Sequence, residues 1–198
     1  MRVFKFGGAS VKDAAGIKNV ASIVQQYGQK NLVVVVSATG KTTNALEVVI
    51  NDYFENKDAK ASFDIVKQNH HQICVDLFRT ETHEVFDKLQ NIYAEVDWQI
   101  EEQRKESFNY VYDQIVSQGE LISSVILSAY LNEVGAKNSW LDVRDVMKTD
   151  DTYREAIVDW SKTQQLMDSL VKPMATNSIV VTQGFIGCTA ENCTTTLG

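Results

Sequence analysis

A lysine followed by two glycines lies near the start of the chain, in the stretch KFGGAS. Lys5 falls in an alternating apolar segment that we expect to be a buried strand, and Gly7 and Gly8 follow it. Two glycines let the backbone approach an anion, and the N–H groups of the next turn can donate hydrogen bonds to phosphate oxygens. The lysine could neutralise charge on a transferring phosphoryl group. A glycine turn beside a solvated lysine would give the same sequence pattern, so this stretch alone does not distinguish a phosphate-binding turn from an ordinary one.

A second glycine-containing loop, SATGKTTN, stands between a β-branched run and a helical pattern. Its Gly40-Lys41-Thr42 sequence matches the end of a P-loop, but a P-loop also needs a glycine five residues before Gly40. That position is Val35, in the middle of the expected strand. We therefore reject a P-loop nucleoside triphosphatase. A G-x-G-x-x-G dinucleotide fingerprint is also absent from the sequence.

Two charged residues further along could bind a small charged ligand. Glu120, in SQGELISS, falls in the first turn of an apolar helix. The helix dipole favours a carboxylate there by ~0.3–1 kcal/mol, and an ammonium group on a ligand is the alternative reason. Arg144, in WLDVRD, can pair with Asp142 or Asp145, or it can bind a small carboxylate through a bidentate contact. The sequence leaves these alternatives open.

Four predicted strands would position these residues. The segment at residues 3–6 is the first, and the run NLVVVV is the second, with the continuous apolar character of a strand buried on both faces of a parallel sheet. AKNSWLDV and SIVVTQGFIG supply the third and fourth. The loops with unusual residues each follow one of these strands. Since ligands bind beyond the carboxyl ends of strands in an open parallel sheet, we expect one shared crevice.

Helical periodicity covers most of the remaining chain. Apolar residues over 17–24 form one stripe, for which Asp13 is the expected N-cap. Residues 43–134 are predicted to be almost wholly helical. A Ser–Gln capping box predicts a helix over residues 162–171, which Pro173 would end. The order of elements indicates one α/β domain with a long helical excursion after the second strand.

The composition limits the partners and the compartment. A net charge of −7 over 198 residues argues against nucleic acid or an anionic membrane as the main partner. No apolar run approaches the ~20 residues that cross a bilayer, and no basic-then-apolar leader precedes the first strand, so we expect a cytoplasmic protein. The three cysteines are scattered, with no histidine near the C-x4-C pair. We expect reduced structural thiols, ordinary helical histidines and no metal site.

Together the motifs resemble one family. KFGGASV, VVSATGKTTN, QGELISS, WLDVRDVMKTDD, TQGFIG and TTTLG follow one another from end to end of the chain. This set is similar to aspartokinase, of the amino acid kinase family. The resemblance implies an α/β three-layer sandwich with a mainly parallel sheet flanked by helices, like carbamate kinase. It also implies transfer of the γ-phosphoryl group of ATP, with Mg2+, to the side-chain carboxylate of L-aspartate, the entry to lysine, threonine and methionine biosynthesis.

The resemblance also implies roles for individual residues. Lys5 would stabilise the transferring phosphoryl group, within a backbone cradle. That cradle would consist of Gly7, Gly8 and Ser10. Thr43 and Glu120 match substrate-binding positions. Three further residues would fall near the aspartate pocket: Ser37, Arg144 and Phe185.

Two departures from the family pattern matter. Ala9 stands where many relatives have threonine. The family continues TTTLG with an Arg-Gly-Gly-Ser-Asp stretch, whereas this sequence stops at Gly198. We therefore expect residues 1–198 to be the amino-terminal part of the kinase domain, without the nucleotide-binding part and the regulatory ACT domains, and inactive alone. The parent would be a homo-oligomer. A kinase for another small acid and a non-catalytic amino-acid-binding module are the alternatives.

Overall fold

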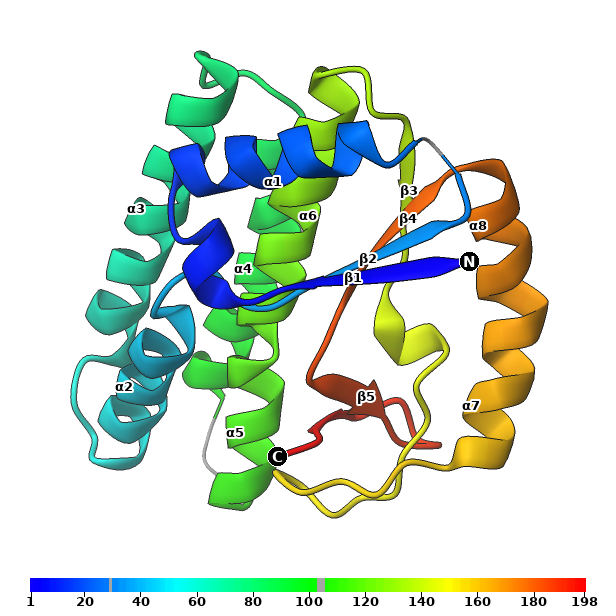
Figure 1. Cartoon of the computed structure of the whole chain (residues 1–198). Helices are drawn as coiled ribbons and strands as arrows, with labels where there is room; N and C mark the ends of the chain where they lie inside the picture. Colours follow the sequence, from blue (N-terminus) through cyan, green and yellow to red (C-terminus); the bar gives the residue numbers. More distant parts are fainter. Residues whose placement is uncertain (29, 103–105) are drawn as a thin grey trace.

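A parallel four-stranded sheet forms the centre of the computed structural model, which describes residues 1–28, 30–102 and 106–198. The strand order is β1-β2-β4-β3, and each neighbouring pair is parallel. Figure 1 shows the sheet between two layers of helices. The predicted α/β class and the predicted parallel sheet are confirmed. The strand bounds are β1 (Arg2–Phe6), β2 (Leu32–Val36), β3 (Asn138–Trp140) and β4 (Ile179–Gln183).

The valine run of β2 is buried on both faces of the sheet. Val34 and Val36 belong to the larger apolar cluster, which includes α1 (Ala14–Gln26) and α6 (Gln118–Glu133). Val33 belongs to the cluster on the opposite face. Because successive side chains of a strand point to opposite faces, a strand between two helical layers needs apolar residues at every position. This explains the continuous run in the sequence.

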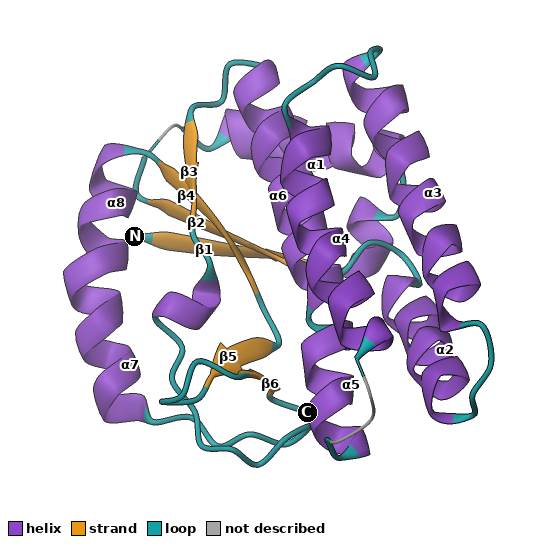
Figure 2. Cartoon of the chain, turned by 180° about the vertical axis from the view of Figure 1, so that it is seen from behind, coloured by secondary structure: helices purple, strands orange, loops and turns teal. Residues whose placement is uncertain are grey.

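Helices outside α6 form a further layer, seen from behind in Figure 2. The helix α6 is buried along nearly its whole length, because the sheet lies on one side of it and this outer layer on the other. The prediction of a long helical excursion after the second strand is confirmed in the part of the chain that the structure describes. The outer helices are α2 (Thr42–Phe54), α3 (Ala59–Phe78), α4 (Val85–Glu101) and α5 (Phe108–Val116).

Local capping signals were right at one helix and wrong at another. Asp13 caps α1, since its carboxylate accepts a hydrogen bond from the Gly16 amide at 2.8 Å. The late helix, however, begins at Trp160 and is capped by Asp159, so the predicted Ser–Gln capping box is wrong. Pro173 does not end it either. The bounds there are α7 (Trp160–Leu166), a π-helical stretch η3 (Met167–Val171) and α8 (Lys172–Asn177).

Proline is compatible with this position because it stands in the first turn of α8. The preceding π-helical stretch changes the hydrogen-bond pattern before the proline, and a proline in a first turn lacks only an N–H that the helix does not need. The chain therefore stays helical past Pro173 and covers the second face of the sheet, where Val171 and Ala175 pack in the same apolar cluster as Val33.

A short antiparallel hairpin near the end of the chain was not predicted. Its strands are β5 (Ile186–Cys188) and β6 (Thr194–Thr196). The carboxylate of Asp113, on α5, is fully buried and accepts hydrogen bonds from the Thr196 hydroxyl at 2.7 Å and from the Thr196 and Arg154 amides at 2.9 and 3.0 Å. A long-range side chain therefore holds this hairpin, whose three-residue strands are too short to stand out in the sequence.

Three smaller expectations have mixed outcomes. Lys5 is not on a buried strand: β1 lies at the edge of the sheet, and both Val3 and Lys5 are exposed. The three cysteines are free thiols. His83 precedes α4 and is not a helical residue, whereas His70 lies in α3 and is buried.

Among the described residues, no helix is both long and apolar enough to span a bilayer.

Candidate functional site

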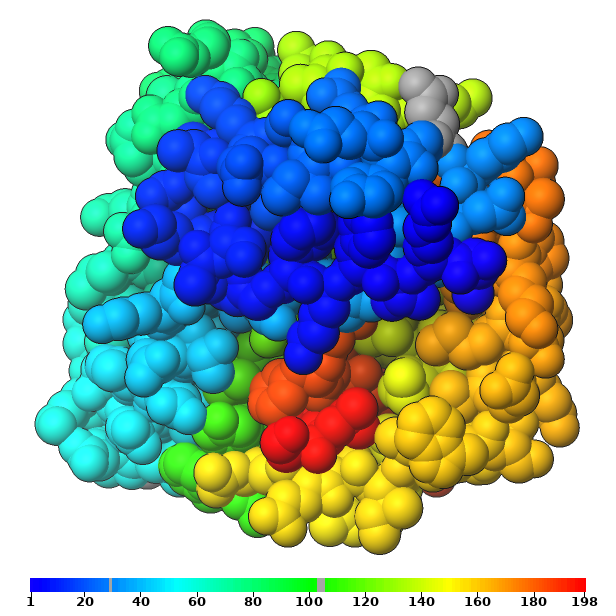
Figure 3. All heavy atoms as spheres, in the orientation of Figure 1, coloured from blue at the N-terminus to red at the C-terminus, as the bar shows by residue number. Residues whose placement is uncertain are grey.

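The loops that follow the strands meet at one edge of the sheet. Since the strands are parallel, their carboxyl ends share this edge. The Ser37 amide donates to the Phe6 carbonyl at 3.0 Å, and the Leu141 amide donates to the Val181 carbonyl at 2.9 Å, so the pairing continues just past the ends of β2 and β3. In Figure 3 the last part of the chain (red) reaches the surface directly below the N-terminal strand (blue). The expected gathering of the loops is therefore present.

The two glycines after β1 have different tasks. The Gly40 amide donates to the Gly8 carbonyl at 3.0 Å, and a Cβ atom on Gly8 would lie 2.5 Å from the Ala38 carbonyl oxygen. Gly8 is therefore required because the first loop touches the second. A Cβ atom on Gly7 would meet nothing within 4 Å, so Gly7 leaves open space beside the backbone. The short 3-10 helix η1 (Gly8–Val11) follows, and the Ser10 amide donates to the Gly7 carbonyl at 2.8 Å.

Glu120 is a buried carboxylate at this edge. Only 3% of the residue is exposed, and its Oε1 accepts a hydrogen bond from the Ala38 amide at 3.3 Å. Its Oε2 is buried and accepts no hydrogen bond from the described residues. Burial raises the pKa of Glu120 to about 7, although the Ala38 amide acts in the opposite direction. A buried oxygen without a donor costs free energy, and an ammonium group is one kind of donor that would satisfy it.

The first turn of α6 reaches this position because Gly119 has no side chain. A Cβ atom there would lie 3.1 Å from the Ala38 Cβ atom and 3.3 Å from the Thr42 Cγ2 atom. The small residue thus lets α6 approach the loop after β2, and the carboxylate of the next residue reaches a backbone amide of that loop. The glycine and the glutamate of QGELIS act together, which no local pattern indicated.

A buried histidine, His70, expected from the sequence to be an ordinary helix residue, holds the loop after β2. The Thr42 hydroxyl donates to the Thr39 carbonyl at 2.6 Å and lies 3.3 Å from Nε2 of His70. Burial lowers the pKa of His70 to about 4, against the opposing contact of its Nδ1 with the Val66 carbonyl at 2.8 Å. The imidazole is therefore neutral at neutral pH, and no spacing within α3 could have shown its contact with Thr42.

Other predicted residues lie at the same edge or apart from it. Ser37 and Thr43 are half-buried on either side of the loop after β2. Phe185 follows β4 with a left-handed φ of 68° and lines a separate cavity of about 620 Å³ that reaches Gly198. Its carbonyl accepts from the Leu197 amide at 2.9 Å. Phe185 thus lies where the last residues of the chain return to the sheet.

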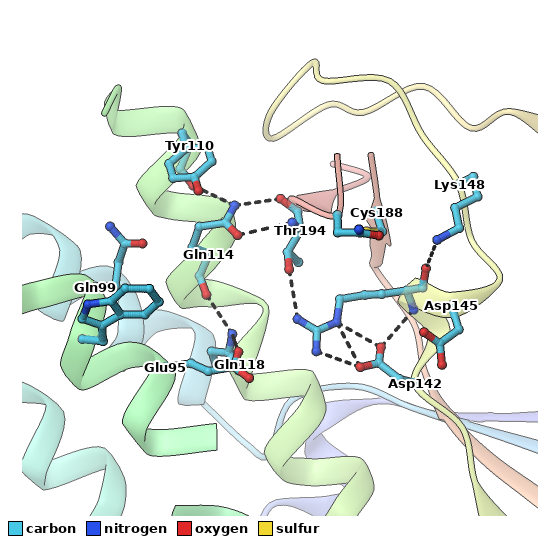
Figure 4. Close-up of a pocket in the computed structure, with 13 residues that line it drawn as sticks. Glu95, Gln99, Tyr110, Gln114, Gln118, Asp142, Asp145, Lys148, Cys188 and Thr194 are labelled. Carbon is cyan, nitrogen blue, oxygen red and sulfur yellow. Dashed lines mark hydrogen bonds and ion pairs between the residues drawn. The ribbon is translucent and has the colours of Figure 1, made fainter. Parts of the chain in front are cut away.

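Arg144 lies in a different cleft, shown in Figure 4. Its guanidinium forms an ion pair with Asp142, with Nη2 2.7 Å from Oδ2, and Nη1 donates to the Thr194 hydroxyl at 3.0 Å. The pairing with Asp142, one of the two structural alternatives for Arg144, is therefore observed. None of the other residues predicted for the site lines this cleft.

The described residues contain no group of three or more His, Cys, Asp or Glu side chains that could hold a metal ion. Mg2+ is usually bound by one or two carboxylates together with phosphate oxygens of a substrate, which requires no such group.

Comparison with known proteins shows which class of protein has this fold and this arrangement of loops at the carboxyl edge of the sheet. The chain belongs to the amino acid kinase family, whose model matches residues 1–198. Within that family, its similar relatives are aspartokinases. It is 30% identical over 196 residues to lysine-sensitive aspartokinase 3 of Escherichia coli, and 29% identical over 220 residues to chloroplastic aspartokinase 2 of Arabidopsis thaliana.

A solved structure agrees with this placement. The crystal structure of E. coli aspartokinase III in complex with aspartate and ADP superimposes with a TM-score of 0.85 at 29% identity, covering 100% of this chain and 43% of that one. The chain also spans 43% of the length of the E. coli relative and 37% of the Arabidopsis relative. The match therefore covers the whole of this chain but less than half of these relatives.

Proposed function

We propose that the chain is the amino-terminal part of an aspartate kinase, which phosphorylates the side chain of L-aspartate with ATP. The observation that carries the proposal is the buried carboxylate of Glu120, whose free Oε2 faces no donor among the described residues. An α-ammonium group would supply that donor and would neutralise the buried charge. The complex of the E. coli relative with aspartate and ADP supports both ligands.

The step itself needs no proton transfer. An oxygen of the aspartate side-chain carboxylate attacks the γ-phosphorus of ATP. The bond from that phosphorus to the β,γ-bridging oxygen breaks, and the electron pair leaves with ADP. The products are 4-phospho-L-aspartate and ADP. Since both reactants are anions, the task of the protein is to hold them in line and to stabilise the developing charge.

Each residue of the sheet edge takes one part of this task. Glu120 binds the ammonium group of aspartate, and Thr43 and Ser37 donate hydrogen bonds to its carboxylates. Lys5 stabilises the transferring phosphoryl group. Its exposure at the end of β1 supports this role, because a solvated lysine can reach a ligand above the strand ends. Gly7, Gly8 and Ser10 provide the backbone cradle, whereas Phe185, in its separate cavity beside Gly198, is given no part in this scheme.

The proposal also includes the phosphoryl donor, the compartment and the oligomeric state of the protein. We propose ATP with Mg2+, which would neutralise oxygens of the triphosphate, and a cytoplasmic homo-oligomer without nucleic-acid or membrane partners. Because the chain spans less than half of its relatives, we propose that turnover needs residues beyond position 198 and that residues 1–198 alone turn over negligibly. The pathway would be that of lysine, threonine and methionine.

The test is a hydroxylamine trap for acyl phosphate with ATP, Mg2+ and L-aspartate. It is run on residues 1–198 and on the chain extended by its natural continuation. We expect aspartyl hydroxamate from the extended chain, at least a 100-fold lower rate in its Lys5→Ala variant, and a raised KM for aspartate in its Glu120→Gln variant. Lys12→Ala, at another exposed lysine, is the matched control.

Three outcomes would count against the proposal. Hydroxamate formation from another small acid in preference to aspartate would indicate the related acid kinase. Aspartate binding without turnover in the extended chain would indicate the binding module. Rapid turnover by residues 1–198 would contradict the assignment of essential groups to the rest of the protein.

A further inference from the structure

The cleft that contains Arg144 is a second candidate ligand site. It has a volume of about 530 Å³ and lies between the outer helices α4 and α5 on one side and the 3-10 turn η2 (Val143–Asp145) with the β5–β6 hairpin on the other. Figure 4 shows the polar side chains that point into it from both sides. Glu120, Lys5 and Ser37 do not line it, so the cleft is separate from the proposed aspartate site.

The guanidinium of Arg144 is held rigidly but keeps hydrogen-bonding capacity. Nε and Nη2 donate to Asp142, and Nη1 donates to the Thr194 hydroxyl. A guanidinium has five N–H groups, so these contacts leave one N–H on each of the two terminal nitrogens. That free edge matches the two oxygens of a carboxylate. Lys148, which follows η2, adds a positive charge with its Nζ atom donating to the Arg144 carbonyl at 2.7 Å, and the carboxylates of Asp142 and Asp145 line the same wall.

An opposite charge faces this edge from the other wall. Glu95, on α4, accepts a hydrogen bond from Nε2 of Gln118 at 3.2 Å and forms no ion pair with Arg144 among the described residues. Burial lowers the pKa of Arg144, but Asp142, and then Glu95, outweigh burial and raise it. The two charges therefore interact across the cleft without contact.

Gln118 adds an unpartnered acceptor on the Glu95 side. Only 3% of the residue is exposed, and its Nε2 donates to Glu95 and to the Gln114 carbonyl. Its Oε1 is buried and accepts no hydrogen bond from the described residues. A carboxylate and a carboxamide oxygen side by side form a receptor for a group with several N–H donors, such as an ammonium.

We propose that this cleft binds a free α-amino acid as its zwitterion, with the carboxylate on Arg144 and the ammonium on Glu95 and Gln118. A zwitterion fits because Arg144, although paired with Asp142, keeps N–H groups for a carboxylate, while Glu95 and Gln118 on the other wall offer acceptor oxygens to an ammonium. The volume leaves room for a side chain, and the indole of Trp98, on α4, supplies an apolar wall for it. The proposal does not depend on kinase activity.

The test is isothermal titration of residues 1–198 with each of the twenty L-amino acids. Circular dichroism first confirms that the protein and its variants are folded. We expect at least one amino acid to bind and both its N-acetyl form and its methyl ester to bind at least tenfold more weakly, since each lacks one charge. Glu95→Gln and Arg144→Lys should each raise Kd at least tenfold, and Glu95→Gln changes an exposed residue that threatens folding little.

Two controls keep this site apart from the proposed aspartate site. Glu101→Gln removes another exposed carboxylate of α4, one that does not line the cleft, and should leave Kd unchanged. Glu120→Gln should also leave it unchanged, although it weakens binding at the sheet edge. Binding that the blocked amino acids share, binding insensitive to Glu95→Gln and Arg144→Lys, or no binding by any of the twenty would each overturn the inference and leave the kinase proposal untouched.

Discussion

Replacing Glu120 by glutamine should make the folded chain more stable at alkaline pH while it removes the proposed ammonium receptor. The glutamine Oε1 can still accept the Ala38 hydrogen bond, but the side chain no longer carries a charge into a buried site. Function and stability would then conflict at this residue, as is common where a binding site keeps a buried charge.

The magnitude follows from the pKa. Burial raises the pKa of Glu120 from 4.5 to about 7. Because one pKa unit corresponds to ~1.4 kcal/mol, ionising this carboxyl costs the folded state about 3.5 kcal/mol relative to the unfolded chain. The folded pKa lies above the unfolded one, so the folded state binds more protons in this interval. The contribution of Glu120 is most favourable below pH 4.5 and is lost as the pH rises to about 7.

Urea denaturation at pH 5, 6, 7 and 8 measures this effect as the difference in unfolding free energy between the variant and the wild type. We expect that difference to grow with pH and to reach about 3 kcal/mol at pH 8. Saturating L-aspartate should stabilise the wild type at pH 8 and not the variant. Asp151→Asn, at an exposed carboxylate, is the control and should show no such trend. A difference that does not change with pH would refute the conclusion that the Glu120 carboxyl is buried and has a raised pKa.

Three further predictions concern the sheet edge and the hairpin. Gly8→Ala should lower the unfolding free energy by about 1–3 kcal/mol, measured by urea denaturation, because the new Cβ atom would lie 2.5 Å from the Ala38 carbonyl oxygen. Asp113→Ala should lower the melting temperature by several degrees in a thermal scan, since the Thr196 and Arg154 amides and the Thr196 hydroxyl would lose their acceptor; an unchanged melting temperature would contradict the anchoring role. Lys5→Ala should leave the unfolding free energy within about 0.5 kcal/mol of wild type, because the side chain is exposed, and a larger loss would mean that Lys5 has a structural contact.

The elements that local patterns determine were predicted well. The stripe of apolar residues over 17–24, the Asp13 cap and the valine run of β2 depend on the helical period, on a nearby side chain and on burial of both strand faces. Each of these signals lies within a few residues of the element that it defines. The parallel sheet and the meeting of the loops at one edge followed from the same patterns, since parallel strands place their carboxyl ends together.

The late helix shows where such local signals fail. Its start was assigned to a Ser–Gln pair, yet Asp159, one residue before the helix, makes the cap. Pro173 was expected to end a helix and instead lies in the first turn of α8. Several polar residues in a row could serve as caps, so the local sequence did not single out Asp159. Val171 and Ala175 pack in the apolar cluster on the second face of the sheet, a contact that the local pattern does not show.

The amino-acid sequence by itself determined the family resemblance, the parallel sheet and the residue types at the strand ends, because each is encoded by short segments. Only the tertiary structure decided which of those residues meet. It buried the Glu120 carboxylate beside the Ala38 amide. It also brought His70 of α3 into contact with the Thr42 hydroxyl at the start of α2 and placed Lys5 on an exposed edge strand. It also directed Arg144 into a second cleft, facing Glu95. These relations join residues that are distant in sequence, and the packing of whole helices on the sheet fixes them.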